Sequence, residues 1–274
     1  MSKKQKKIIR DFGNEWERFD QKRLDESELL KIFNDYFNIF PFDKINNQSE
    51  GFDLGAGSGR WAFFISDKVK TLNVIEPSSA INVSRSKLVK KNNIKYFNQD
   101  VFNLTLKEGS QDFGYSLGVL HHIEDTEAAL KKCNLLLKKD APFLMYLYYS
   151  FDNRSYIYKF IWKLSNLLRI FISILPNNIK NIITDIIAVV IYFPLANLSK
   201  ILNKFNFKTN NIPLNYYKDV SFYTMRTDSR DRFGTKLEKR FTKLEIKKLL
   251  EKSGFKNISF SSNSPFWVSL SYKK

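Results

Sequence analysis

Three glycines at alternate positions provide a backbone turn that could hold a nucleotide-like ligand. They lie in the segment Asp53-Leu54-Gly55-Ala56-Gly57-Ser58-Gly59, which follows a short apolar run and precedes a helical pattern beginning at Trp61. Glycine adopts positive φ angles readily, so such a turn can bring its N–H groups close to a ligand. The N-terminal end of the following helix carries a partial positive charge at the same place. The segment therefore predicts a binding site for a nucleotide-like cofactor.

The spacing of the glycines argues against a dinucleotide. The dinucleotide fingerprint is G-x-G-x-x-G and places a pyrophosphate at the helix N-terminus. Its third glycine would fall at position 60, which is Arg60. Asp53 would repel a phosphate, but it would suit a ligand with a cationic or amino group. Glu76 ends the next apolar run, where an acidic side chain can accept hydrogen bonds from ribose hydroxyls.

Four pieces in this order resemble the class I S-adenosylmethionine (SAM)-dependent methyltransferases. They are Asp53-x-Gly55-x-Gly57-x-Gly59, then Glu76, then Asp100, then Gly118-Val119-Leu120-His121-His122-Ile123. The resemblance covers about residues 45–150, and the closing part of the chain from about residue 235 fits as well. The alternative is a Rossmann-like domain that binds another adenosine compound or has lost binding.

The resemblance implies which residues hold SAM. Asp53 and the backbone of residues 55–59 would hold the methionine end, and Glu76 would accept from the ribose hydroxyls. Asp100 would accept from the adenine amino group, while Val101 or Phe102 packs the ring. The complete implied set is Asp53, Gly55, Ala56, Gly57, Ser58, Gly59, Glu76, Pro77, Asp100, Val101, Leu117 and Gly118. Taken singly, Asp53 could be a solvated strand-end acid and Asp100 an ordinary loop acid.

The only two histidines, His121 and His122, follow the fourth expected strand. In related enzymes this position faces the transferred methyl group. A neutral imidazole could remove a proton from a hydroxyl group near pH 7, which makes His121 the candidate catalytic base. Either ring could instead only pack beside the cofactor, and methyl transfer can rely on positioning alone. Two histidines without further ligands do not predict a metal site.

Substrate contacts are expected in two places. Tyr148, Tyr149, Asn153 and Arg154 come just after the fifth expected strand. The segment Asp228–Gly234, which contains Arg232, mixes both signs of charge beside an aromatic residue and suits a polar pocket or a salt-bridged loop. The candidate substrate residues are His122, Tyr148, Arg154 and Arg232.

The elements that must position these residues form a doubly wound α/β fold. Apolar runs alternate with helical patterns between residues 50 and 150, which is typical of a parallel sheet. Strands are expected at 50–54, 72–76, 94–98, 112–118 and 142–148, and helices at about 58–68, 78–91 and 125–138. Right-handed crossovers would bring Asp53, Glu76, Asp100 and Gly118 to one edge.

The end of the chain should complete the sheet. A capping box, Thr242-x-x-Glu245, predicts a helix that stops near Gly254. Two runs, 257–261 and 266–272, predict an antiparallel strand pair. With the resemblance, this implies a mostly parallel seven-stranded sheet with an antiparallel C-terminal edge strand.

Four segments are expected along the chain. Residues 1–45 would be an N-terminal tail, mobile and basic over residues 1–10, followed by a helix that packs on the core. Residues 46–150 would be the SAM-binding core, 151–234 a helical insertion after the fifth strand, and 235–274 the closing helix and strand pair.

The insertion carries two apolar patterns. One is a helical stripe that Pro176 stops, and the other is the run 186–193, which ends at Pro194 and is too short to span a bilayer. A cap over the active site is the preferred interpretation. A dimer interface, or peripheral membrane contact through residues 156–205, is the alternative.

Composition narrows the partners. The formal net charge of +17 favours anionic partners or reflects a lysine-rich solvated surface. The single cysteine, Cys133, excludes an internal disulfide and is expected in the core of a helix. The basic N-terminus lacks a signal-peptide apolar region, so the protein is expected in the cytoplasm, with peripheral contact at the inner membrane surface as an option.

The sequence thus predicts an enzyme that transfers a methyl group from SAM to a small or lipid-linked acceptor, at oxygen. The apolar, aromatic insertion favours an acceptor with hydrophobic character. A nucleic-acid or protein methyltransferase is one alternative, but Leu117-Gly118-Val119-Leu120 stands where many amino-directed nucleic-acid enzymes carry Asn/Asp-Pro-Pro-Tyr/Phe, and no RNA-binding module is apparent. A non-catalytic membrane-associated protein of the same fold is the other.

Overall fold

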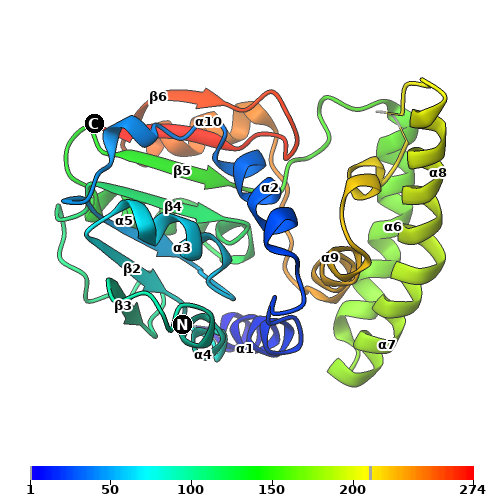
Figure 1. Ribbon diagram of the computed structural model, residues 1–274, viewed down its shortest axis with the longest axis horizontal. Coiled ribbons are helices and arrows are strands. Elements are labelled where there is room, and N and C mark those ends of the chain that lie inside the picture. The colour runs from blue at the N-terminus through cyan, green and yellow to red at the C-terminus, as the bar shows by residue number, and fades with distance from the viewer. Residues whose placement is uncertain (1, 210–211) are drawn as a thin grey trace. The chain divides into compact units, whose positions relative to one another are not determined.

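The computed structural model describes residues 2–209 and 212–274, and these form two units (Figure 1). The first, called the sheet unit, comprises the residues up to Lys22, Leu29–Ser150 and Leu237–Lys274. The second, called the helical unit, comprises Arg23–Glu28 and Phe151–Lys236.

The sheet unit is built on a seven-stranded sheet. Its strands are β1 (Glu50–Leu54), β2 (Thr71–Ile75), β3 (Ile94–Phe97), β4 (Phe113–Leu117), β5 (Pro142–Tyr146), β6 (Phe255–Phe260) and β7 (Ser269–Lys273). They lie in the order β3-β2-β1-β4-β5-β7-β6, with β1 to β5 paired in parallel. β7 is antiparallel to both β5 and β6. The predicted fold is confirmed, with one difference: the antiparallel strand lies one place in from the edge, because β6 pairs outside it.

Helices cover both faces of this sheet. Those belonging wholly or mainly to the sheet unit are α1 (Lys3–Arg18), α2 (Glu26–Phe37), α3 (Arg60–Ile65), α4 (Ala80–Lys87), α5 (Thr126–Leu136) and α10 (Lys243–Lys252), with 3-10 turns at Phe42–Lys44, Ser66–Lys68 and Leu120–His122. Cys133 of α5 and Leu250 of α10 pack on one face with Phe143 of β5. Phe37 of α2 packs on the other, 5.3 Å between ring centroids from Tyr115 of β4. The expected core position of Cys133 is confirmed.

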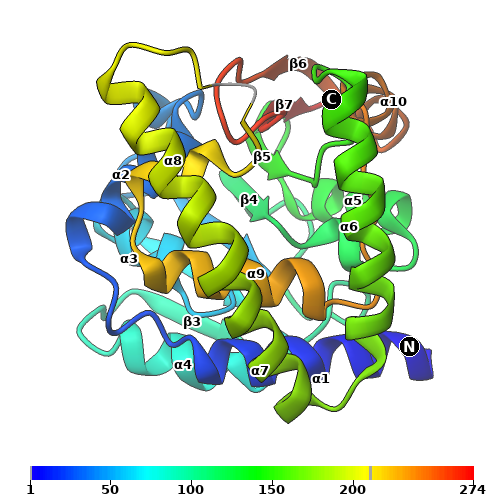
Figure 2. The ribbon, with the colours of Figure 1, turned by 90° about the vertical axis from the view of Figure 1, so that its right-hand side faces the viewer.

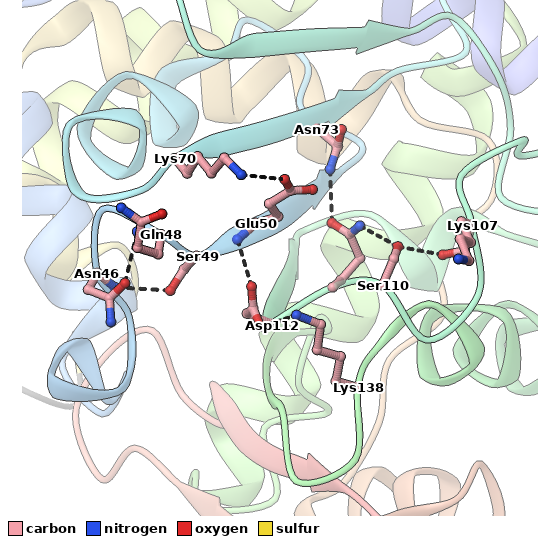
Figure 3. Close-up of polar contacts among 11 residues, drawn as sticks. Asn46, Gln48, Ser49, Glu50, Lys70, Asn73, Lys107, Ser110, Asp112 and Lys138 are labelled. Carbon is pink, nitrogen blue, oxygen red and sulfur yellow. Dashed lines mark hydrogen bonds and ion pairs between the residues drawn. The ribbon is translucent and has the colours of Figure 1, made fainter.

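A polar network fastens β1, β2 and β4 together away from the glycine turn (Figure 3). Asn73, buried in β2, donates from Nδ2 to Oε1 of Gln111 at 2.9 Å. Asp112 accepts from the backbone N–H of Glu50 at 2.8 Å and pairs with Lys138 at 2.6 Å. Hydrogen bonds between buried polar groups favour one arrangement of a core. The network therefore supports the strand register that positions the carboxyl ends of these strands.

The N-terminal residues differ from the expectation of a mobile tail. Residues 3–18 form α1, and Ser2 caps it by accepting from the backbone N–H of Gln5. Ile8 is buried, and α1 packs against α4. The prediction of a mobile tail is wrong for residues 3–10, because apolar residues spaced along this basic segment give it a packing face, and Met1 lies outside the described residues.

The helical unit contains the remaining helices. They are α6 (Tyr156–Ile174), α7 (Asn177–Ile187), a π turn (Ala188–Tyr192), α8 (Phe193–Lys204), a 3-10 turn (Asn215–Asp219) and α9 (Phe222–Gly234). α9 packs against both α6 and α7, and Met225 and Phe233 of α9 join Ile172 and Ile187 in a small core. Figures 1 and 2 show α6 and the α7–α8 helix on the same side of α9.

The helical unit differs from the sequence expectations in two places. The apolar run 186–193 stops at Pro194, but the helix that contains it continues, because α7, the π turn and α8 form one helix, Asn177–Lys204, of 28 residues. This helix is long and apolar enough to cross a membrane by length and composition. Proline has no backbone N–H and cannot donate a helical hydrogen bond. The π turn just before Pro194 lets the helix continue without that bond. Residues 228–234 were expected in a loop or polar pocket, but they are the last turns of α9.

Candidate active site

The glycine turn lies at the carboxyl end of β1. Gly55, Gly57 and Gly59 have φ angles of +77°, +54° and +75°, a region that residues with a Cβ rarely adopt. The turn is fixed to β2, because the Gly55 and Ala56 N–H groups both donate to the Ile75 carbonyl, at 2.8 and 3.2 Å. β1 and β4 are neighbours although β2 and β3 come between them in sequence. Such a reversal of strand order is where open α/β sheets bind ligands.

Glu76 braces this turn from the end of β2. Its Oε2 accepts from the Gly57 N–H at 3.0 Å, and its Oε1 accepts from the N–H and the hydroxyl of Ser78 at 2.9 and 2.6 Å. Glu76 is buried. Because a carboxylate has about four acceptor positions, Glu76 can hold the turn and still accept from a ligand hydroxyl.

Asp53 lies beneath the turn in β1, opposite Tyr115 of β4. Its side chain is 1% exposed, and Oδ2 has no hydrogen-bond partner among the described residues. Burial raises the pKa of the Asp53 carboxyl to about 8; the Glu76 charge also raises it, while the Tyr115 hydroxyl and Arg60 lower it. The Ser58 hydroxyl is likewise buried and unbonded within the described part of the chain. The turn therefore contains buried polar atoms that a ligand could satisfy.

A cavity of about 380 Å³ opens beside Asp100 and Pro77. Asn98 and Asn103 also line it, together with Lys6 and Ile9 of α1. The Asp100 carboxylate accepts from the backbone N–H groups of residues 102 and 103 and from the Asn103 side chain. Val101 is buried in the apolar core beside it. The cavity therefore offers both polar and apolar lining groups to a ligand.

β4 ends beside the glycine turn. Leu117 is its last residue and is buried, and Gly118 follows with φ +79°. The Val119 side chain packs directly on the turn, since a Cβ at Gly55 would lie 2.4 Å from it. Asp53, Glu76, Asp100 and Gly118 are thus all at the carboxyl ends of parallel strands, as the sequence predicted.

The two histidines form a cluster with Tyr148. The His121 ring stacks on the Tyr148 ring and lies beside the His122 ring, with centroid distances of 3.9 Å in each case. His121 is fully buried, and neither of its ring nitrogens has a hydrogen-bond partner among the described residues. Burial lowers the pKa of His121 well below its usual range, and the charges of His122, Arg240 and Lys239 lower it further. His121 is therefore a neutral imidazole.

His122 is held by a backbone contact. Its Nδ1 lies 2.6 Å from the Leu237 carbonyl oxygen. A carbonyl can only accept, so Nδ1 carries the proton and donates it. Phe12 of α1 packs on the His122 ring at 4.7 Å between centroids.

α1 lies over the site from one end to the other. Gln5 contacts the His122 carbonyl at 3.4 Å, and Trp16 lies at the glycine turn, where a Cβ on Gly57 would be 2.8 Å from its indole ring. The Arg60 guanidinium packs 5.2 Å from the Trp16 ring and 4.3 Å from the Trp61 ring. No local sequence pattern could show that Trp16 lies against Gly57.

The candidate substrate residues divide between the two units. His122 and Tyr148 come together in the sheet unit, where Arg240 also packs 5.1 Å from the Tyr148 ring. Arg154 and Arg232 belong to the helical unit, where their guanidinium groups pack against the rings of Tyr158 and Trp162. Sequence reasoning missed Tyr115 and Arg240, because an ordinary strand tyrosine and a surface-like arginine carry no motif.

Residues 52–145 match the family model described as a methyltransferase domain. These residues are a class I SAM-dependent methyltransferase domain. Solved structures are similar to the chain as well. SibL, a SAM-dependent methyltransferase, aligns in its apo form with 12% identity and a TM-score of 0.53, over 89% of this chain and 55% of SibL. At this identity the likeness shows the fold.

Two further structures align less closely. A SAM-dependent methyltransferase from Thermotoga maritima gives 17% identity and a TM-score of 0.49, over 98% of this chain and 99% of that one. Phosphoethanolamine N-methyltransferase 1 of Haemonchus contortus, in complex with phosphoethanolamine and S-adenosylhomocysteine, gives 16% identity and 0.43, over 52% of this chain and 32% of that one. This chain therefore spans a third of the Haemonchus protein and about half of SibL. No curated protein matches the chain.

The cofactor of the methyltransferase domain is SAM, and the residues present fit it. The unbonded Asp53 and Ser58 oxygens, the spare acceptor capacity of Glu76 and the cavity beside Asp100 suit a ligand with an amino group, ribose hydroxyls and adenine. When bound, SAM supplies an electrophilic methyl group on a positively charged sulfur.

Proposed function

We propose that the methyltransferase domain transfers the methyl group to a hydroxyl of a small or lipid-linked acceptor with hydrophobic character. The observation that carries this proposal is the state of His121. It is fully buried at the carboxyl end of β4, neutral, and without a hydrogen bond from either ring nitrogen among the described residues.

A neutral imidazole is the form that accepts a proton. A hydroxyl acceptor must lose its proton as it is methylated, so a base beside it assists the reaction. Tyr148 stacks on His121 and holds its ring plane, while Arg240 packs 5.1 Å from the same tyrosine ring and donates to the Tyr149 carbonyl at 3.1 Å. These contacts make Tyr148 and Arg240 positioning residues for the base.

The cofactor end of the site contributes by holding its ligand. Glu76 accepts from the ribose hydroxyls, Asp53 faces the amino group, and Asp100 with Pro77 and Val101 holds the adenine ring. Holding the cofactor in one orientation relative to the acceptor can supply much of the rate of methyl transfer, because the reaction is a displacement that depends on positioning.

The apolar side chains of the helical unit support an acceptor with hydrophobic character. The helical unit exposes many large apolar side chains, among them Tyr156, Phe160 and Phe171. The residues after β4 are Gly118-Val119-Leu120, which supports a small-molecule enzyme over an amino-directed nucleic-acid enzyme.

Binding of the cofactor is tested first. Isothermal titration calorimetry with SAM and with S-adenosylhomocysteine should give heats that Asp53→Ala and Glu76→Ala greatly reduce. Glu127→Ala, at the surface of α5, is the matched control and should bind normally. If Asp53→Ala and Glu76→Ala leave the SAM affinity unchanged, the assignment of these residues is wrong.

The acceptor class is tested by pairs of compounds. Release of S-adenosylhomocysteine is measured with apolar alcohols and phenols, each beside the amine of the same carbon skeleton. We expect turnover with the hydroxyl member of a pair and loss of kcat in His121→Phe with SAM affinity retained. Turnover confined to the amines would overturn the assignment to oxygen.

A further inference from the structure

The helical unit exposes an unusual amount of apolar surface. On α6, Ile157, Phe160, Leu164, Phe171 and Ile174 are between 51% and 74% exposed. These residues recur at three- and four-residue steps or their sums, so they form one stripe along the helix. The buried residues of α6 are Arg169, Ile172 and Ser173, on the side that meets α9.

The α7–α8 helix carries a second stripe of the same kind. Ile182, Ile186, Val190, Ile201 and Phe205, which follows the last turn, are between 53% and 70% exposed. The helix has 28 residues, so it extends about 40 Å at 1.5 Å per residue. In both ribbon views α6 and this helix lie on one side of α9. The two stripes together are called the apolar face of the helical unit. Large amounts of exposed apolar surface mark docking sites.

The charges around the apolar face are almost all positive. Between Ser155 and Thr209 the chain has seven basic residues and one acidic residue, Asp185. Arg169 and Lys180 are buried and donate to the Thr235 and Gly234 carbonyls, and Asp185 pairs with Arg226. The outward charges are therefore lysines: Lys159, Lys163, Lys200, Lys204 and Lys208.

We propose that the apolar face docks on a lipid bilayer that contains anionic lipids. The apolar stripes would enter the boundary between headgroups and acyl chains, and the lysines would contact lipid phosphates, as in other basic amphipathic helices. Charge decides against a second copy as the occupant. A symmetric dimer through this face would bring two sets of five lysines together, and Asp185, the one acidic residue between residues 155 and 209, is already paired with Arg226.

The polar contacts of α7 indicate that the helix lies on the membrane and does not cross it. Asp185 accepts two hydrogen bonds from Arg226, at 2.8 and 3.1 Å. Ser229 donates to the Thr184 carbonyl at 2.8 Å, and Lys180 donates to the Gly234 carbonyl at 3.1 Å. A crossing would place the charged groups Lys180, Asp185 and Arg226 in hydrocarbon, which strongly disfavours it. A surface position leaves them on the side away from the lipid.

The experiment is co-sedimentation of the full chain with vesicles. One set contains phosphatidylcholine alone and the other an equal mixture of phosphatidylcholine and phosphatidylglycerol. We expect the chain to bind the mixed vesicles, and we expect this binding to weaken as salt is added. In Lys200→Glu/Lys204→Glu the partition coefficient should be at least about tenfold lower, because each basic residue near an anionic surface adds to the attraction. Phe171→Asp should also lose most of its binding.

Matched variants separate docking from general charge and apolarity. Lys248→Glu/Lys252→Glu on α10 reverses the same two charges at the same helical spacing, and Val89→Asp alters an apolar residue that is 74% exposed in the sheet unit. Both should bind vesicles like the unaltered chain. Circular dichroism checks that each variant folds, and SAM titration reports the methyltransferase domain separately.

Three results would overturn the proposal. One is equal loss of binding in the α10 pair and the α8 pair, which would indicate attraction by net charge alone. Another is equal binding to both vesicle sets at low salt. The third is a stable dimer in light scattering that Phe171→Asp dissociates, which would make a second copy the occupant.

Discussion

The indole ring of Trp16 lies directly on the backbone of Gly57, so close that a Cβ at position 57 would stand 2.8 Å from two of its atoms. Gly57 also has a positive φ of +54° and donates its N–H to Glu76. One glycine therefore joins α1, the turn after β1 and the acid after β2.

Gly57→Ala should weaken both folding and cofactor binding. The left-handed conformation costs about 1–2 kcal/mol for a residue with a Cβ, and the methyl group must displace Trp16. We expect a lower free energy of unfolding in urea and a SAM affinity reduced by about tenfold or more. Gly109→Ala is the control, because Gly109 also has a positive φ, +63°, but a Cβ there meets nothing within 4 Å. Equal effects of the two substitutions would show that the Trp16 contact is unimportant.

The stability of the ligand-free chain should fall as pH rises from about 4 to about 8. The pKa of Asp53 is raised from 3.8 to about 8, so in this window the folded chain holds a proton that the unfolded chain has released. The free energy of unfolding then decreases by up to about 1.4 kcal/mol per pH unit, and this contribution is constant above pH 8. Asp53→Asn should remove the slope. Urea unfolding of both proteins at several pH values measures it, and parallel curves would contradict the buried neutral carboxyl.

Binding of SAM should release a proton near pH 7. The amino cation of the cofactor favours the ionised form of Asp53, so its pKa falls on binding. Calorimetry in buffers with different heats of ionisation reports the number of protons released. The apparent enthalpy should depend on the buffer in the unaltered chain and much less in Asp53→Asn. An enthalpy independent of buffer would place the cation elsewhere.

Glu76→Gln should loosen the glycine turn. The carboxylate accepts from Gly57 and Ser78 through both oxygens, and an amide replaces one acceptor by a donor that faces another donor. Leaving a buried group unpaired costs about 1–3 kcal/mol, so we expect a destabilised fold and a SAM affinity lowered at least tenfold. Glu127→Gln disturbs only a surface pair with Lys131, so it should leave the stability and the SAM affinity unchanged. Thermal unfolding with and without SAM checks both parts.

The plot of kcat against pH should show no fall near pH 6.5, the usual pKa of a histidine. The pKa of His121 lies well below that value, so its neutral, proton-accepting form persists into acid, and kcat should fall only at lower pH. Tyr148→Ala removes the stacked ring and exposes His121 to water, which should move the acid limb upward, whereas Tyr148→Phe keeps the ring and the profile. A limb near pH 6.5 in the unaltered enzyme would assign the base to another group.

Local sequence patterns predicted the elements that carry the site. Strand ends, the glycine turn and the capping box at Thr242 depend on a few neighbouring residues, so their outcome can be anticipated from spacing alone. The same applies to the common edge of Asp53, Glu76 and Asp100, because parallel strands with right-handed crossovers leave no other arrangement.

Patterns failed where a distant partner decides the conformation. Residues 3–10 are helical because Ile8 is buried as α1 packs on α4. The helix continues through Pro194 because a π turn and the packing of α9 hold it, and residues 228–234 are helical because Ser229 and Arg230 bond to α7.

The sequence by itself determined the kind of ligand, since a glycine turn between acids suits a cation-bearing nucleoside and this follows from residue types and order. Only the tertiary structure decided the protonation of the site. Whether Asp53 is charged and whether His121 is neutral depend on water exclusion by Tyr115, Tyr148 and the rest of the packed core, and burial of a titratable group is a property of the packed chain and not of its neighbours in sequence.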